Sequence, residues 1–238
     1  MCFSAEASLT AAAVLIPAGV YTVTAAWRKD RAYLPLAVIP LLFGAQQCFE
    51  VAVWWGLTHD RPEWVRVGAV GFLFFAIALW PGWVPFAAGR LETGVRRWLF
   101  DGLAVVGLAV GLVAYLPAVV RFGEWLEVTR VEHSIRYDFT RLPGAGTAAG
   151  VAWQAAYMAV VCCPLLLSRH RPVQAFGLVA VAAAAAVVTY LQFRYAFVSV
   201  WCFLAALLSL SLGYTLHRLP PARGRVSSAC TPPVASIE

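Results

Sequence analysis

Seven apolar runs divide this sequence of 238 residues, and each has about the length needed to cross a lipid bilayer. They occupy residues 8–27, 33–57, 65–88, 98–120, 147–167, 173–193 and 196–216. A bilayer core of ~30 Å requires about 20 helical residues. Because 61% of the chain is hydrophobic and only 13% is charged, little of it remains to fold outside a membrane. The sequence therefore predicts an all-α, polytopic membrane protein with a seven-transmembrane-helix domain over residues 1–218.

Clusters of basic residues follow the first, third, fifth and seventh apolar runs. They comprise Arg28, Lys29 and Arg31, then Arg90, Arg96 and Arg97, then Arg169 and Arg171, and last Arg218, Arg223 and Arg225. Short loops rich in Lys and Arg stay on the cytoplasmic side of a membrane. The pattern predicts a multi-pass protein of the cell (inner or plasma) membrane, with an external N-terminus and a cytoplasmic C-terminus.

The net charge of +6 does not indicate a nucleic-acid partner, because the basic residues stand in short clusters without interleaved aromatic residues. Membrane lipids are the expected partners, and the sequence leaves the oligomeric state open. Residues 219–238 are rich in Pro, Ser and Ala and lack apolar periodicity. They are predicted to form a disordered cytoplasmic tail.

The second apolar run contains three polar residues that share one helix face. At 100° per residue, Gln46, Gln47 and Glu50 form a stripe on an otherwise apolar helix. An ionisable side chain within a membrane span is energetically costly and by default marks a functional site. The alternative is a purely structural network of hydrogen bonds between helices, which are ordinary in membrane bundles.

Polar residues of other runs fall at a similar depth, in the outer half of the predicted bundle. Gln154 and Tyr157 belong to the fifth run, and Ser199 and Cys202 to the seventh. Buried polar groups need partners, and these could supply one another. We expect an outward-opening pocket around Glu50, with Gln46, Gln47, Gln154 and Tyr157 as its supporting shell.

The loop 121–146, expected on the external side, contains a segment with the two-residue period of a β-strand. From Val131 to Thr140, apolar and aromatic residues alternate with polar ones. This alternation would turn Val131, Ile135 and Phe139 toward the bundle, together with His133 and Tyr137, and make the loop a lid. The alternative for His133 is an ordinary hydrogen-bonded histidine on a packed face.

Cys2 is expected at the same outer surface and would become the N-terminal residue if the initiator methionine were removed. Together with Glu50 and His133 it would offer one sulfur, one oxygen and one nitrogen ligand, which suits zinc or another divalent transition metal. The three residues come from separate segments, and no compact ligand spacing links them. Cys2 could equally be a small residue that enters the first helix.

The opening MCFSAEAS, the segment PLLFGAQQCFE with its Gln-Gln-x-x-Glu motif, and the external His133 carry a family likeness. The chain resembles an uncharacterised group of bacterial multipass membrane proteins that begin Met-Cys-Phe-Ser-Ala. No activity follows from this resemblance. The architecture is also similar to seven-helix membrane hydrolases of the alkaline ceramidase type, but the chain lacks their embedded histidines.

Three classes of function remain open. The first is a membrane-embedded enzyme that acts on a lipid or other amphiphile, with Glu50 as general base or metal ligand and His133 and Tyr137 as groups that position water or donate a proton. The second is a proton- or cation-coupled transporter or channel, and the third is a ligand sensor or assembly subunit without catalysis. The apolar inner half of the spans argues against transport, and the short tail argues against a sensor.

Overall fold

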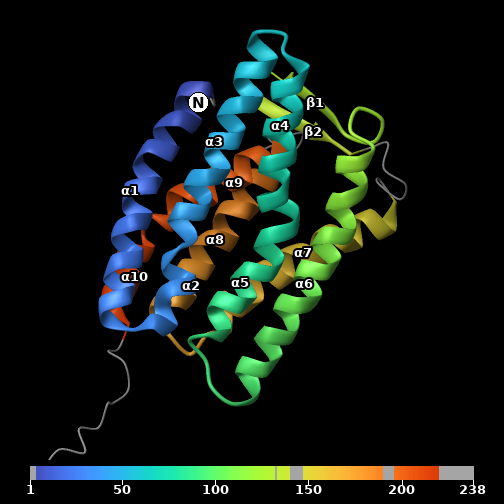
Figure 1. Cartoon of the computed structure of the whole chain (residues 1–238). Coiled ribbons are helices and arrows are strands. Elements are labelled where there is room, and N and C mark those ends of the chain that lie inside the picture. Colours follow the sequence, from blue (N-terminus) through green and yellow to red (C-terminus); the bar gives the residue numbers. More distant parts are fainter. Residues whose placement is uncertain (1–3, 132, 140–146, 190–195, 220–238) are drawn as a thin grey trace, which may run out of the picture.

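The protein is a bundle of helices that lie side by side, with a β-hairpin at one end of the bundle (Figure 1). The computed structural model describes residues 4–131, 133–139, 147–189 and 196–219. Its elements are α1 (Ala5–Lys29), α2 (Leu34–Ala37), α3 (Ile39–Thr58), α4 (Pro62–Leu73), α5 (Trp80–Gly89), α6 (Val95–Val120), β1 (Glu127–Val131), β2 (Ser134–Asp138), α7 (Ala148–Leu166), α8 (Arg171–Thr189), α9 (Phe197–Ser209) and α10 (Leu212–Arg218). The start of α1 and the hairpin lie at one end of the bundle, and the α5–α6 loop and the end of α10 lie at the other. The predicted tail lies, apart from Leu219, outside the described residues.

Several helices have the length and apolar character needed to cross a membrane. Four stretches qualify, namely Ala5–Lys29, Arg31–Thr58, Pro62–Gly89 and Val95–Val120. The helices α9 and α10 meet at 41° and make a fifth if they form one bent span. The helices α7 and α8 are also apolar but shorter. The prediction of a mostly helical protein with membrane-compatible helices is confirmed, whereas the count of seven spans is not established.

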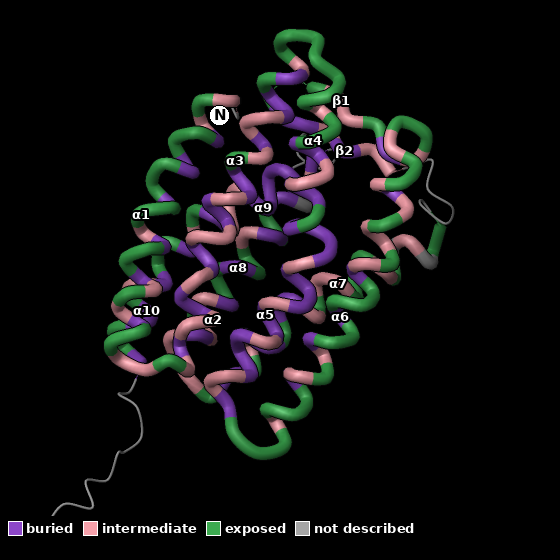
Figure 2. The backbone as a smooth tube through the Cα atoms, viewed as in Figure 1, coloured by how far each residue is buried: buried purple, intermediate pink, exposed green. Residues whose placement is uncertain are grey.

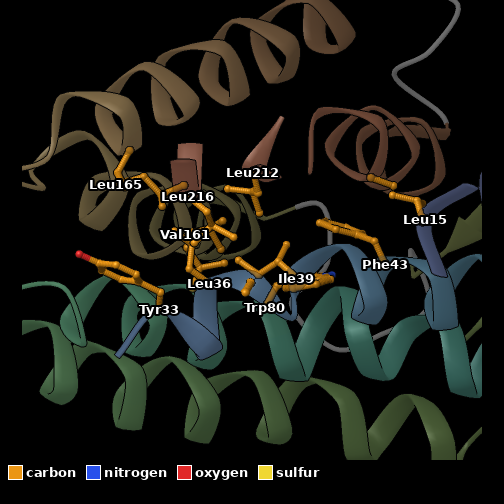
Figure 3. Close-up of a cluster of buried hydrophobic side chains, with 14 of the residues drawn as sticks. Leu15, Tyr33, Leu36, Ile39, Phe43, Trp80, Val161, Leu165, Leu212 and Leu216 are labelled. Atoms are coloured by element: carbon orange, nitrogen blue, oxygen red, sulfur yellow. The ribbon is translucent and has the colours of Figure 1, made fainter. Parts of the chain in front are cut away.

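Buried apolar side chains from α1, α2, α3, α5, α7 and α10 form one cluster (Figure 3). The helices α2, α5 and α10 that contribute to it lie toward the end opposite the hairpin (Figure 1). Leu36 and Leu212 are fully buried within the cluster, and Trp80 is 4% exposed. The indole of Trp80 stacks on the ring of Phe43, with 4.1 Å between the ring centroids. The stacked rings join α3 to α5, and α2 packs against both α5 and α10. Apolar side chains therefore fill this part of the interior.

The helix α1 packs on α3 through small residues and exposes much of its remaining surface (Figure 2). Its buried face contains Ser8, Ala11 and Gly19. A Cβ added at Gly19 would lie 2.5 Å from the backbone nitrogen of Leu41, so only glycine permits this approach. The small face brings the two backbones together and places Ser8 beside the polar stripe of α3.

A π-helical segment, Phe74–Leu79, joins α4 to α5 just before Pro81. Proline has no N–H to donate, and wider turns of this kind release carbonyl groups from the helical pattern. The carbonyl of Ala76 accepts a hydrogen bond from Tyr157 Oη at 2.5 Å. The irregular segment is therefore attached to α7 by a side chain.

The helix α6 packs very closely against this irregular segment. A Cβ built on Gly107 would lie 2.1 Å from the carbonyl oxygen of Pro81, and one on Gly111 would lie 2.4 Å from that of Ile77. Because both neighbours are backbone atoms, neither can move aside without shifting a helix.

We predict that Gly107→Ala destabilises the protein by about 1–3 kcal/mol, the usual cost of overpacking. Gly102→Ala is the matched control, because nothing lies within 4 Å of its added Cβ on the same helix. The control should be neutral or stabilise by about 0.4–1 kcal/mol, as expected for glycine to alanine in an open helical position. Thermal unfolding in detergent measures both, and equal stability of the two variants would contradict the close contact.

The segment between α6 and α7 forms an antiparallel hairpin in which Val131 pairs with Ser134 and Glu127 with Asp138. Ile135 is fully buried and Tyr137 is 7% exposed. Both pack against α3, α4 and α9 in a second apolar cluster. The predicted inward alternation is therefore correct for Ile135 and Tyr137.

The same alternation fails for His133 and Val131. His133 lies in the turn between the strands and is exposed, and Val131 is 36% exposed. A strand period persists only while the segment continues as one strand, and here the chain reverses direction between β1 and β2. The prediction that His133 faces the bundle is wrong for this reason.

Candidate functional site

Glu50 is buried where α1, α3 and α9 meet, with 1% of its surface exposed. Ser8 Oγ on α1 donates a hydrogen bond to Glu50 Oε2 at 3.3 Å. Ser199 Oγ on α9 donates to Glu50 Oε1. Each carboxyl oxygen thus accepts one hydroxyl, which supplies part of the stabilisation that a buried acid needs.

The two glutamines predicted to share the face of Glu50 are fully buried beside it. Gln46 Oε1 accepts a hydrogen bond from the indole Nε1 of Trp80 at 2.9 Å. Gln47 lies close to the Glu50 carboxyl group without the geometry of a hydrogen bond. The predicted stripe is therefore present as a continuous row of buried polar side chains on α3.

Several polar atoms of this cluster have no hydrogen-bond partner in the part of the chain that the structure describes. They are Gln46 Nε2, Gln47 Nε2, Gln47 Oε1 and the hydroxyl of Tyr137. An unsatisfied buried polar group costs about 1–3 kcal/mol, so native structures rarely tolerate several in one place. Their grouping beside Glu50 indicates a place where a polar ligand or water can bind.

Tyr137 reaches the cluster from β2. Its ring stacks on Phe72 with 5.1 Å between centroids and 4° between the ring planes. Burial raises the pKa of Tyr137 well above its ordinary value, and the negative charge of the Glu50 carboxylate raises it further. The phenol is therefore protonated at neutral pH and presents a hydrogen-bond donor.

Two of the residues expected to support Glu50 do not contact it. Gln154 is exposed on α7. Tyr157 is half-buried, and its hydroxyl donates to the carbonyl of Ala76 instead. The orientation of α7 about its own axis decides both outcomes, and the sequence does not show that orientation.

The proposed metal ligands do not form a group among the described residues. Cys2 lies outside them, and His133 is exposed in the hairpin turn. No set of three His, Cys, Asp or Glu side chains in the described ranges could hold a metal ion. Of the proposed ligands that fall within the described residues, Glu50 lies in the polar cluster and His133 does not.

A groove of about 350 Å³ runs between α1 and α9, along the two helices that carry the serine hydroxyls. Ala7 and Ala11 line it on α1, on either side of Ser8, and Phe203 lines it one helical turn after Ser199. The walls are mostly apolar, with Glu6 and Thr10 among the lining residues. The groove thus lies close to the polar cluster on the exposed side of α1.

Ser8 and Glu92 are among the buried polar residues that were not identified from the sequence. Ser8 could have been found from the run of small residues on the inner face of α1. Glu92, in the α5–α6 loop, is 3% exposed and accepts hydrogen bonds from Ser168 Oγ at 2.9 Å and from the backbone N–H of Arg169 at 2.8 Å. Nothing in the sequence around Glu92 indicates burial, and its contacts join two loops.

The fold and the site define a predominantly helical protein with membrane-compatible helices and a buried carboxylate cluster. The chain belongs to a family of unknown function, DUF6629, whose model matches residues 1–227. This agrees with the resemblance to an uncharacterised family. No curated protein and no solved structure shows significant similarity to the chain.

We predict that Ser199→Ala destabilises the protein by about 1–3 kcal/mol, because a buried carboxyl oxygen loses its hydroxyl donor. Ser211→Ala is the matched control, since Ser211 is exposed between α9 and α10. Its effect should stay within about 0.5 kcal/mol. Denaturation in detergent compares the two variants, and an equal effect would show that the contact with Glu50 contributes no stability.

Proposed function

We propose that this protein is a membrane-embedded enzyme that acts on a lipid or other amphiphile, with Glu50 as general base. The observation that carries the proposal is the hydroxyl of Ser199 donating to a buried carboxylate, next to hydrogen-bond donors that lack a partner among the described residues. A hydroxyl nucleophile, an adjacent base and free donors are the groups that acyl transfer requires.

The proposed chemistry is hydrolysis of a carboxylic ester or amide. Ser199 Oγ attacks the carbonyl carbon, and its proton passes to Glu50. Glu50 then returns the proton to the leaving alcohol or amine, and water hydrolyses the acyl-enzyme by the same route. Gln47 Nε2 and the Tyr137 hydroxyl supply donors for the negative oxygen of the intermediate.

Ser199 is favoured over Ser8 as the nucleophile because of the helix that carries it. The helix α9 packs against β2, and Trp201 and Cys202 share the apolar cluster that contains Tyr137. Ser199 therefore lies on the side of Glu50 where a free donor is available. Ser8 donates to the other carboxyl oxygen and orients the base.

The substrate class follows from the groove between α1 and α9. Its apolar lining suits an acyl chain, and Ser8 and Ser199 lie on the helices that form its walls. An amphiphile lying there would bring its polar end toward Glu50. Because Glu50 is 1% exposed, access requires α1 and α9 to separate along this groove.

A proton- or cation-coupled transporter has less support. The apolar cluster around Leu36, Phe43 and Trp80 fills the interior on the side away from the hairpin. The buried hydroxyls of Thr22 and Ser209 in that half donate to backbone carbonyls. A ligand sensor or assembly subunit would use the same cluster for binding, and the absence of serine reactivity would favour it.

A fluorophosphonate reagent, which labels activated serines, tests this proposal on the purified chain in lipid nanodiscs. We predict labelling of Ser199, with Glu50→Gln lowering the labelling rate by about 10²–10⁴-fold, the usual contribution of a general base. The isosteric amide can still accept and donate hydrogen bonds, so the fold should persist.

Two controls make this result specific. Ser211→Ala should label like the parent protein, and Ser199→Ala should not label. If the parent protein fails to react, or if Glu50→Gln reacts at the same rate, Ser199 is not an activated nucleophile and the enzymatic proposal fails.

The proposed topology has seven crossing helices, formed by adding α7, α8 and the α9–α10 pair to the four long apolar stretches. The hairpin would be external and the α5–α6 loop cytoplasmic, in agreement with the basic clusters. We predict that a membrane-impermeant maleimide applied to intact cells labels His133→Cys above the background of the native cysteines and does not label Thr93→Cys. The reverse pattern would invert the topology.

A further inference from the structure

A second cavity, of about 490 Å³, lies between α1 and α10 at the end of the bundle opposite the hairpin. Tyr21, Arg28 and Lys29 line it from α1, and Leu216 and His217 line it from α10. It is separate from the Glu50 cluster and from the groove between α1 and α9. Its polar lining is mainly basic.

Lys29 forms part of the structure of this cavity. Its Nζ donates to the carbonyl oxygens of Leu216 at 2.6 Å and His217 at 3.1 Å, at the C-terminal end of α10. An ammonium group has three protons to donate, so one remains for a ligand. The positive charge of Lys29 is thereby held at the wall of the cavity.

Arg28 provides a second positive charge and is exposed. Within the described residues it has no acidic partner. The nearest acid in the sequence, Asp30, accepts a hydrogen bond from the backbone N–H of Ala32 at 2.9 Å and caps the following turn. His217 Nε2 lies 3.1 Å from the hydroxyl of Tyr21 across the cavity. The guanidinium of Arg28 is therefore free to bind an anion.

The two helices that line this cavity also carry exposed aromatic residues, each beside a basic side chain. Arg31 lies over the ring of Trp27 at 4.3 Å from its centroid, and Arg218 lies over Tyr214 at 5.0 Å. Exposed Trp and Tyr next to Arg are typical of the membrane–water interface. These residues favour a position of the cavity at the level of the lipid headgroups.

We propose that this cavity binds the phosphate headgroup of an anionic phospholipid. The planar guanidinium of Arg28 matches two phosphate oxygens, and the remaining proton of Lys29 matches a third. Basic pockets between membrane helices on the cytoplasmic side bind such headgroups in this way. The exposed apolar surface of α1 beside Val20 and Tyr21 accommodates the acyl chains. The proposal does not depend on the activity proposed for Glu50.

Native mass spectrometry of the full chain in detergent tests the proposal, with phosphatidylglycerol compared with phosphatidylcholine. We expect selective retention of phosphatidylglycerol. Arg28→Gln should weaken its binding about fivefold, the effect of about one basic side chain near a lipid surface. Arg28→Lys should keep most of the affinity, because the charge remains.

Arg171→Gln is the matched control, because it removes the same charge from an exposed position at the start of α8, outside the cavity. Its binding of phosphatidylglycerol should equal that of the parent protein. An equal loss in both Gln variants would show general electrostatic attraction and overturn the proposal. If millimolar inorganic phosphate displaces phosphatidylglycerol, the cavity is a site for soluble phosphate and the lipid proposal is overturned. Equal retention of the two lipids would also overturn it.

Discussion

The burial of one carboxyl group where three helices meet is the constraint on which the arrangement of this protein depends. Glu50 accepts hydrogen bonds from the hydroxyls of Ser8 and Ser199, which are separated from it by 42 and 149 positions in the sequence. Such a group is tolerated in an apolar interior only when its partners are held in place. The small residues of α1 let that helix approach α3 closely enough for Ser8 to reach Glu50, so helix packing and the polar contact support each other.

The interior of the bundle is polar near the hairpin and apolar toward the other end. The polar site is therefore closed on the side away from the hairpin. Near the hairpin, Gln47 and Tyr137 present polar atoms without partners among the described residues. Toward the other end, the stacked rings of Phe43 and Trp80 begin a packed apolar region. Trp80 belongs to this apolar region and also donates a hydrogen bond to Gln46. This hydrogen bond connects the polar side chains of α3 to the apolar region. A ligand that enters from the hairpin side would meet polar atoms and then a closed wall.

The sequence predicted the parts of this arrangement that depend on local periodicity. Apolar runs located the helices, the 100° rule located the face of Glu50, and alternation located Ile135 and Tyr137. It failed where tertiary geometry decides the outcome. His133 falls at a chain reversal, Gln154 faces outward because of the rotation of α7, and the pairing of Ser8 with Glu50 depends on a close approach of backbones. The first two leave no periodic signal in the chain, and the small residues of α1 indicate that Ser8 is buried but do not identify its partner.

The position of α1 links the two ends of the protein. This helix is held near its start by the contact of Ser8 with Glu50 and near its end by the contacts of Lys29 with α10. A groove lies beside it near each of these contacts, against α9 at one end and against α10 at the other. Much of its surface is exposed, so fewer packed side chains resist its movement than resist movement of α3. An outward shift of α1 would therefore cost less packing than a shift of α3, and an anionic lipid bound beside Lys29 would hold the other end of α1 in place.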